Sequence, residues 1–142
     1  MPTMDTLPPR ILLVDDEKEV RDRLYTLLEN EGYEVLASSS GPDALHIFRL
    51  SVRPIELLVT DYNMPGMSGL ELVRECSRLG GELKVLYVSG SRPDAELLTD
   101  LQAGQHGFLA KPFRRGDLVR KVRELMQAES SAHLSMSSKY HA

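Results

Sequence analysis

The sequence predicts an α/β protein in which five parallel strands and five helices form a doubly wound, five-stranded sheet, a (βα)₅ arrangement. Short apolar runs alternate with helical patterns along the chain. The first of these runs is apolar throughout, as in a strand buried on both faces of a parallel sheet. The length of 142 residues is that of a single domain, so we expect one core.

The first strand is predicted at residues 11–14, and a helix follows at residues 20–30. Gly32 is the expected stop of this helix, because glycine readily adopts the left-handed conformation that commonly follows a helix. A weaker strand is predicted at residues 33–37, and the next helix opens at Gly41 with proline in its first turn. The side chains expected to face the sheet are Val20, Leu24, Leu27 and Leu28 in the first helix and Ala44, Leu45 and Phe48 in the second.

The third strand is predicted at residues 55–60 and ends at Asp61. A loop at residues 63–69 follows, in which Gly66 and Gly69 are expected to serve backbone geometry. The next helix is expected to present Leu70, Val73 and Leu79 to the sheet. The remaining elements are a strand at 83–88, a helix at 94–103, a strand at 107–110 and a helix at 117–126.

Both ends of the chain fall outside this pattern. Residues 1–9 are marked by prolines and residues 128–142 are rich in serine, so we expect two flexible extensions around a domain at residues 10–127. The carboxyl-terminal extension has few sizeable apolar groups and cannot form a core of its own. We therefore expect no separate output domain in this chain.

Composition and charge exclude several classes of protein. Hydrophobic residues make up 42% and charged residues 27%, the balance of an ordinary globular chain. The formal net charge of −4 disfavours DNA binding by bulk charge. No apolar run is long enough to span a membrane, and the first residues lack the basic stretch and apolar run that are typical of a signal peptide. A single cysteine, Cys76, excludes an intramolecular disulfide, and we expect a cytoplasmic protein that binds neither DNA nor membrane.

Polar residues follow four of the predicted strands, at the point where each strand ends. Asp15 and Asp16 follow the first strand, Asp61 the third, Ser89 the fourth and Lys111 the fifth. Ligand sites in open parallel sheets lie at the carboxyl ends of the strands, so these groups are expected to converge. Three neighbouring carboxylates repel one another unless they share a hard cation, and oxygen ligands suit Mg²⁺. A phosphoryl group held there would have Asp61 as its nucleophile.

At these positions the chain resembles the response-regulator receiver family of two-component and phosphorelay signalling. The resemblance covers roughly residues 10 to 127 and rests on four segments that together are specific, although each is weak alone. These segments are ILLVDDE at 11–17, DYNMPGMSG at 61–69, VSG at 88–90 and KPF at 111–113. The family implies a flavodoxin-like sheet with the strand order 2-1-3-4-5. It also implies a phosphoacceptor signalling domain that catalyses only its own Mg²⁺-dependent phosphorylation and dephosphorylation.

The resemblance implies a role for each acidic residue of the site. Asp61 would accept the phosphoryl group from a sensor histidine kinase or a histidine phosphotransfer protein. Asp16 would bind Mg²⁺ directly and Asp15 largely through water. Asp61 and the backbone carbonyl of Asn63 would complete the ligands from the protein.

The resemblance also implies how the phosphorylated state is reported. Lys111 would pair with the phosphate, and a cis peptide bond between Lys111 and Pro112 would aim its side chain into the site. The Ser89 hydroxyl would move to the phosphate. Phe108 would then change rotamer and alter the face made by the fourth helix, the fifth strand and the fifth helix, where a downstream protein would bind. Threonine is frequent at the position of Ser89 and tyrosine at that of Phe108. Because Phe108 lacks a hydroxyl, a signal that depends on a tyrosine hydrogen bond from this position is excluded.

Several alternatives stay open at this point. Asp15, Asp16 and Asp61 could cap helices or turns, and Phe108 could be a core aromatic as well as a switch. A degenerate receiver, acting as a binding scaffold independent of phosphorylation, is the main functional alternative. The segments at 84–90 and 109–113 are most similar to receivers at the carboxyl end of hybrid histidine kinases. The sequence leaves open whether the chain stands alone or is part of such a kinase, and whether it forms a homodimer.

Overall fold

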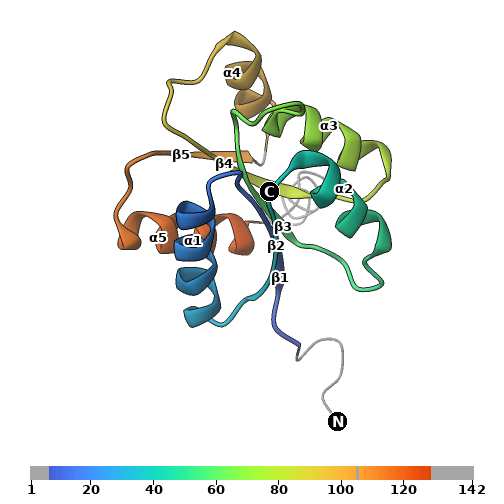
Figure 1. Ribbon diagram of the computed structural model, residues 1–142, viewed down its shortest axis with the longest axis vertical. Coiled ribbons are helices and arrows are strands. Elements are labelled where there is room, and N and C mark those ends of the chain that lie inside the picture. Colours follow the sequence, from blue (N-terminus) through green and yellow to red (C-terminus); the bar gives the residue numbers. More distant parts are fainter. Residues whose placement is uncertain (1–6, 105, 129–142) are drawn as a thin grey trace, which may run out of the picture.

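Five parallel strands form one sheet in the order β2-β1-β3-β4-β5, as the resemblance implied. Figure 1 labels the strands and the five helices that surround them. The computed structural model describes residues 7–104 and 106–128. The strands are β1 (Arg10–Val14), β2 (Glu34–Ser38), β3 (Leu57–Asp61), β4 (Lys84–Ser89) and β5 (His106–Ala110). The helices are α1 (Lys18–Asn30), α2 (Gly41–Leu50), α3 (Gly69–Arg78), α4 (Ala95–Gln102) and α5 (Arg115–Gln127).

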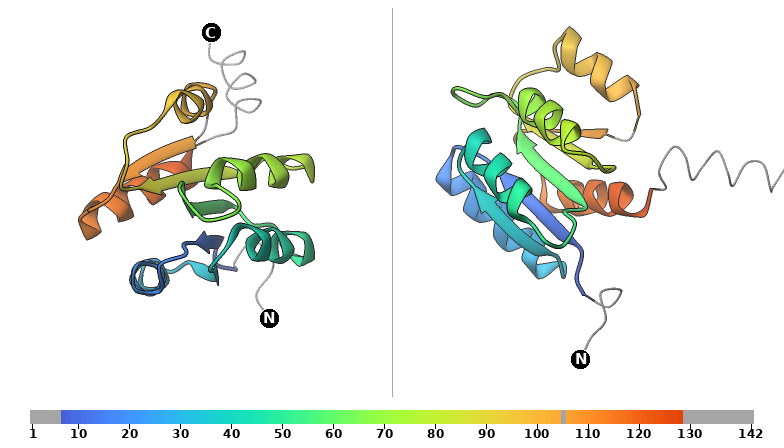
Figure 2. Two further views of the ribbon diagram at one scale, coloured as in Figure 1. Left: turned by 45° about the horizontal axis from the view of Figure 1, so that its top comes forward. Right: turned by 90° about the vertical axis from the view of Figure 1, so that its right-hand side faces the viewer.

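Helices cover both faces of the sheet, which is why its central strands are apolar throughout. Figure 2 shows α1 and α5 on one face and α2, α3 and α4 on the other. Along β1, Ile11 and Leu13 pack toward α1 and α5, whereas Leu12 and Val14 pack into the core on the other face. All four side chains are fully buried, and each burial contributes about 2 kcal/mol to the hydrophobic driving force.

The direction of winding reverses at β1, and this places the first and third strand ends side by side. β1 pairs with β2 on one side and with β3 on the other. In the register of the second pairing Val14 lies opposite Thr60, so the next residues of the two strands, Asp15 and Asp61, leave the sheet beside each other. Such a reversal point is where open α/β sheets bind ligands.

The element bounds agree with the sequence predictions to within about two residues, and the predicted stop at Gly32 is confirmed. Gly32, after α1, has a φ of 93°, which glycine adopts without strain. Ser40 caps α2, because its side chain accepts a hydrogen bond from the Asp43 backbone N–H. β3 starts later than predicted, at Leu57, because the buried side chain of Ile55 belongs to the preceding loop.

The prediction that Leu79 faces the core is wrong. α3 ends at Arg78, and Leu79 is its C-cap with 48% of its surface exposed. The predicted positions Leu70, Val73 and Leu79 are spaced by multiples of three residues. Each step of three residues falls about 60° short of a full helical turn, so Leu79 lies off the buried face. The apolar face of α3 consists instead of Leu70, Leu72, Val73 and Cys76.

The regular elements run from Arg10 to Gln127. Of the two predicted extensions, residues 1–6 and 129–142 lie outside the described residues. Among the helices that the structure describes, none is long and apolar enough to cross a bilayer.

Candidate functional site

Three carboxylates and one ammonium meet at the carboxyl edge of the sheet. Asp15, Asp16 and Asp61 each place one oxygen within 4.8 Å of the others. Lys111 Nζ lies 3.1 Å from Asp15 Oδ2 and 3.7 Å from Asp61 Oδ2. The structure therefore brings together four of the residues predicted from the sequence, from the ends of three strands.

The two adjacent aspartates differ in their surroundings. Asp15 is buried, and its carboxylate accepts hydrogen bonds from the Glu17 backbone N–H at 2.9 Å and from Lys111 Nζ at 3.1 Å. Its backbone carbonyl accepts a further bond from Arg21. Asp16 is exposed to solvent. Asp15 is therefore fixed by the protein, whereas Asp16 is open to a ligand from outside.

Asp61 is a buried carboxyl in a crowded electrostatic field. Only 7% of its surface is exposed. Burial, followed by repulsion from Asp15 and Asp16, raises the pKa of Asp61 to about 6, although the Lys111 ammonium opposes the rise. One ammonium among three carboxylates leaves an excess of negative charge, and a bound cation would relieve it.

Lys111 is held at the edge by the strand that precedes it. Its backbone N–H donates to the Ser89 carbonyl at 2.8 Å, and its bond to Pro112 is cis, as predicted. Burial disfavours the charged ammonium, but the hydrogen bond to Asp15 and the charges of Asp15 and Asp61 outweigh this and raise the pKa of Lys111. Lys111 is therefore a cation already directed at the acids.

Ser89 connects the loops that follow β3 and β4. It is buried, and its Oγ accepts hydrogen bonds from the Ser91 backbone N–H at 3.1 Å and from Asn63 Nδ2 at 3.4 Å. Asn63 makes this contact with its side-chain amide. Its backbone carbonyl is the group predicted to bind the metal, and that role stays a prediction. A movement of the Ser89 hydroxyl would release both donors.

The loop between β3 and α3 approaches the site closely, and two glycines permit this. Gly66 has a φ of 81°, in the left-handed region. A Cβ on Gly69 would overlap the backbone oxygen of Asp61. Both glycines therefore serve backbone geometry, as predicted from the sequence.

Phe108 lies on β5 opposite Tyr87 of β4, and it packs half-buried against the core on the α2, α3 and α4 side. Tyr87 is fully buried, and its hydroxyl has no hydrogen-bond partner among the residues that the structure describes. Burial, followed by the nearby Asp100 carboxylate, raises the pKa of Tyr87. Neither Tyr87 nor its neighbour Tyr62 was predicted from the sequence to take part in the site, although Tyr62 directly follows Asp61.

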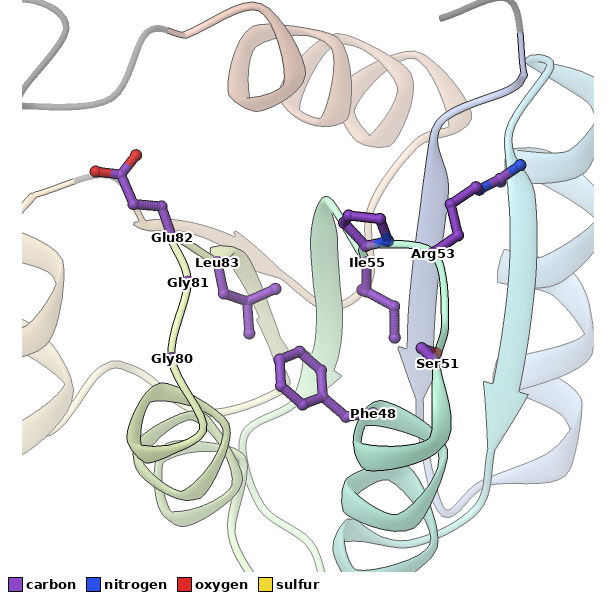
Figure 3. A pocket seen from close by; sticks show the side chains of 9 residues that line it. Phe48, Ser51, Arg53, Ile55, Gly80, Gly81, Glu82 and Leu83 are labelled. Atoms are coloured by element: carbon purple, nitrogen blue, oxygen red, sulfur yellow. The ribbon is translucent and has the colours of Figure 1, made fainter. Parts of the chain in front are cut away.

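Other candidate groups lie elsewhere in the described chain and form no second site. Cys76 is buried, and burial raises the pKa of its thiol to about 11, as expected for an inert core residue. A hollow of about 250 Å³ lies at the opposite edge of the sheet, where Phe48, Ile55 and Leu83 line it (Figure 3). Its charged lining residues are Arg53, which already pairs with Glu34, and Glu82, so this hollow has no cluster of acids like that of the carboxyl edge.

The comparisons with known proteins agree with this geometry. Residues 11–123 match the family model of the response regulator receiver domain. The chain is 35% identical over 121 residues to the response regulator MprA of Mycolicibacterium vanbaalenii, covering 85% of this chain and 52% of that protein. It is 34% identical over 124 residues to the response regulator receiver protein CpdR of Brucella abortus, covering 84% of this chain and 98% of that protein.

Among solved structures, the chain is similar to the receiver domain of the hybrid histidine kinase CckA. The TM-score is 0.71 at 33% sequence identity, covering 83% of this chain and 99% of that one. Several curated relatives are longer, and the chain spans about half their length. The match over residues 11–123, with the strand order and the acidic edge, shows that the chain belongs to the response regulator receiver domain family, the signalling domains of two-component systems.

Proposed function

We propose that this receiver accepts a phosphoryl group on Asp61 from a histidine kinase or a histidine phosphotransfer protein, and that it then changes conformation to control a partner. One observation carries the proposal. The oxygens of Asp15, Asp16 and Asp61 lie within 4.8 Å of one another, and Lys111 Nζ is 3.7 Å from Asp61. A buried carboxylate between a cation and two further acids has the surroundings of a phosphoryl acceptor rather than of a helix cap.

The acidic cluster fits a hard divalent cation, and we assign Mg²⁺ to it. The donor set consists of carboxylate oxygens, which Mg²⁺ prefers. Burial and then repulsion from Asp15 and Asp16 raise the pKa of Asp61, and a cation would offset the repulsion. Asp15, Asp16, Asp61 and the backbone carbonyl of Asn63 are the proposed ligands. When bound there, the ion would neutralise part of the charge that the phosphoryl oxygens bring.

The residues of the chain then act on the phosphoryl group directly. A carboxylate oxygen of Asp61 forms a bond to phosphorus while the bond from phosphorus to the donor histidine nitrogen breaks, and that nitrogen keeps the electron pair. Lys111, now bound to Asp15, is close enough to Asp61 to pair with a phosphoryl oxygen instead. Ser89 supplies a hydroxyl that donates to another oxygen. The domain would catalyse only its own phosphorylation and the hydrolysis of the product.

The phosphodonor protein must cover this edge to bring its histidine to Asp61. A hollow of about 280 Å³ lies directly beside Lys111, with Val20, Pro112 and Phe113 in its lining. The Arg23 guanidinium lies 5.6 Å from the centre of the Phe113 ring, which adds a cation to an otherwise apolar surface. We assign the docking of the donor to this hollow.

The conformational change that reports phosphorylation would begin at Ser89. Movement of its hydroxyl toward the phosphate frees space beneath it, Phe108 turns inward, and the surface of α4, β5 and α5 changes. A downstream protein that binds only the changed surface would detect the phosphorylated state. A cytoplasmic location is part of this proposal, since the one cysteine is a buried free thiol of the kind found in a reducing compartment.

The experiment that tests the proposal is labelling by acetyl phosphate with and without Mg²⁺, followed by the mass of the intact protein. Wild type should gain one phosphoryl group only with Mg²⁺, and Asp61→Asn should gain none. Asp43→Asn, which alters an exposed acid on α2, is the matched control and should label like wild type. Labelling of Asp61→Asn at the wild-type rate would contradict the assignment, and a wild type that never labels would favour the scaffold alternative.

A further inference from the structure

Helix α4 is held to the rest of the molecule by few apolar contacts. Leu97 is its one buried residue, whereas α3 has five, and the neighbouring Leu98 is 46% exposed. Burial of Leu97 contributes about 2 kcal/mol, and Leu101, which is only partly buried against the same core, contributes less. Polar contacts therefore have a large share in fixing the position of α4.

The amino-terminal end of α4 is tied to the residue that follows the phosphoacceptor. The Tyr62 hydroxyl lies 2.9 Å from each carboxylate oxygen of Asp94 and donates to this group. Asp94 is also the N-cap of α4, because its Oδ1 accepts a hydrogen bond from the Leu97 backbone N–H at 2.9 Å. One carboxylate therefore both starts the helix and joins it to Tyr62.

Tyr62 has little freedom to follow a movement of α4. Its backbone N–H donates to the Val88 carbonyl at 3.1 Å, and its own carbonyl accepts from the Gly69 N–H at 2.8 Å. Both contacts fix it to the sheet and to the start of α3. The Tyr62 hydroxyl thus holds Asp94 at a position that the end of β3 defines.

The contact between Tyr62 and Asp94 is charge-assisted. Hydrogen bonds from the Leu97 N–H and the Tyr62 hydroxyl hold the pKa of Asp94 below its ordinary value, so its carboxylate is ionised at neutral pH. The Tyr62 hydroxyl is the donor to this carboxylate. Hydrogen bonds to a charged acceptor are stronger than neutral ones.

A second polar contact lies near the other end of α4, and a row of aromatic rings connects the two. His106 Nδ1 of β5 lies 2.7 Å from Asp100 Oδ2. The ring of Tyr87 meets Tyr62 edge-on at 6.0 Å and His106 at 6.1 Å between centroids. The row from Tyr62 to His106 therefore supports α4 between its two carboxylate contacts.

This arrangement opposes the movement that phosphorylation would start. In the structure the Ser91 N–H donates to Ser89 Oγ, and the segment that follows Ser91 ends at Asp94. When the Ser89 hydroxyl turns to a phosphoryl group, Ser91 loses its acceptor and the segment can shift, unless Asp94 is held in place. The contact of Ser89 with a phosphoryl group would favour a shift of this segment, whereas the contact of Asp94 with Tyr62 opposes it.

We infer that Tyr62 is a positioning residue, whose hydroxyl acts through Asp94 to hold α4 in the arrangement of the unphosphorylated protein and so makes the switch harder. This inference rests on the proposed function. The hydrogen bond from Tyr62 to Asp94 restrains α4 and is separate from the contacts of Ser89 and Phe108. A contact present in only one of two conformations shifts the equilibrium between them by its own net free energy.

The test is the affinity for beryllofluoride, a mimic of the phosphoryl group, in the presence of Mg²⁺. Tyr62→Phe keeps the ring and removes only the hydroxyl, and it should bind beryllofluoride about fivefold more tightly, as expected for loss of one hydrogen bond from the resting state. Tyr33→Phe removes a hydroxyl from the opposite face of the sheet and should match wild type. Asp94→Ser keeps a capping side chain but cannot reach Tyr62. It should reproduce the effect of Tyr62→Phe, and the double variant should bind no more tightly than either single variant.

Wild-type affinity in Tyr62→Phe, or independent and additive effects of the two substitutions, would overturn the inference. A second measurement separates this result from failure of the proposed function, because it uses no phosphoryl mimic. Hydrogen exchange of the α4 amides in the unliganded protein should be faster in Tyr62→Phe than in Tyr33→Phe. Equal exchange in both variants would also overturn the inference. Absence of beryllofluoride binding in wild type would instead contradict the proposed acceptor role.

Discussion

Asp61→Asn should stabilise the metal-free protein at neutral and alkaline pH. In the wild type a buried carboxylate faces two other carboxylates and only one ammonium, and its pKa is raised from 3.8 to about 6. An asparagine keeps the shape of the side chain and removes the charge. The proposed role of Asp61 as acceptor explains such a residue, because functional sites can retain groups that cost stability.

The size and the pH dependence of the effect are set by the pKa. A rise of roughly two in pKa corresponds to about 3 kcal/mol. Because the folded state binds this proton more tightly than the unfolded state, the wild type loses stability as the pH rises from about 4 to about 6, and the loss is complete above about pH 7. Asp61→Asn should therefore be about 3 kcal/mol more stable than wild type at pH 8, and the difference should vanish near pH 3 to 4.

The assay is urea denaturation of both proteins at pH 8 and at pH 4, with a chelator present. Asp43→Asn is the control for loss of an exposed acid and should show no such pH-dependent gain. Addition of Mg²⁺ at pH 8 should stabilise wild type more than Asp61→Asn, because the ion binds the folded wild type. Equal stability of the two proteins at pH 8, or a difference of the same size at both pH values, would refute the electrostatic account of the site.

The same geometry leads to three further predictions. Ser89→Ala should still accept phosphate on Asp61, but the amide NMR shifts that beryllofluoride induces in α4, β5 and α5 should shrink, and identical shifts in both proteins would exclude this path. Lys111→Met should slow labelling by acetyl phosphate and, without metal, destabilise the fold by about 2 kcal/mol in urea denaturation, because it leaves the acids without a cation. Phe113→Ala should reduce the rate of transfer from a phosphorylated histidine protein by about tenfold and the rate of labelling by acetyl phosphate much less, since only the protein donor needs the hollow beside Lys111.

The sequence predicts most of the sheet and the acidic edge, because both depend on local rules. An apolar run such as residues 11–14 has to be buried on both faces, and parallel strands bring the residues at their carboxyl ends to one edge of the sheet. Asp15, Asp61 and Lys111 are therefore found together. The strand order came from the family resemblance, since periodicity alone says nothing of which strands pair.

The features that the sequence did not predict depend on contacts between distant elements. Tyr87 looks like an ordinary strand residue, and only the folded chain places it between Tyr62 and His106. The bond from Tyr62 to Asp94 joins residues 32 positions apart. Leu79 was misplaced for a local reason, because the spacing of α3 was extended past the end of the helix. Side-chain contacts between distant elements are therefore the features that the sequence pattern does not predict.

Asp61 is the proposed acceptor, and the location of the phosphoryl group on the labelled protein tests this assignment. The wild-type protein is labelled with acetyl phosphate and Mg²⁺, the acyl phosphate is reduced with borohydride, and the peptides are sequenced by mass spectrometry. We predict homoserine at position 61 alone, with Asp15 and Asp16 unmodified. Reduction at Asp15 or Asp16 with Asp61 intact would contradict the account.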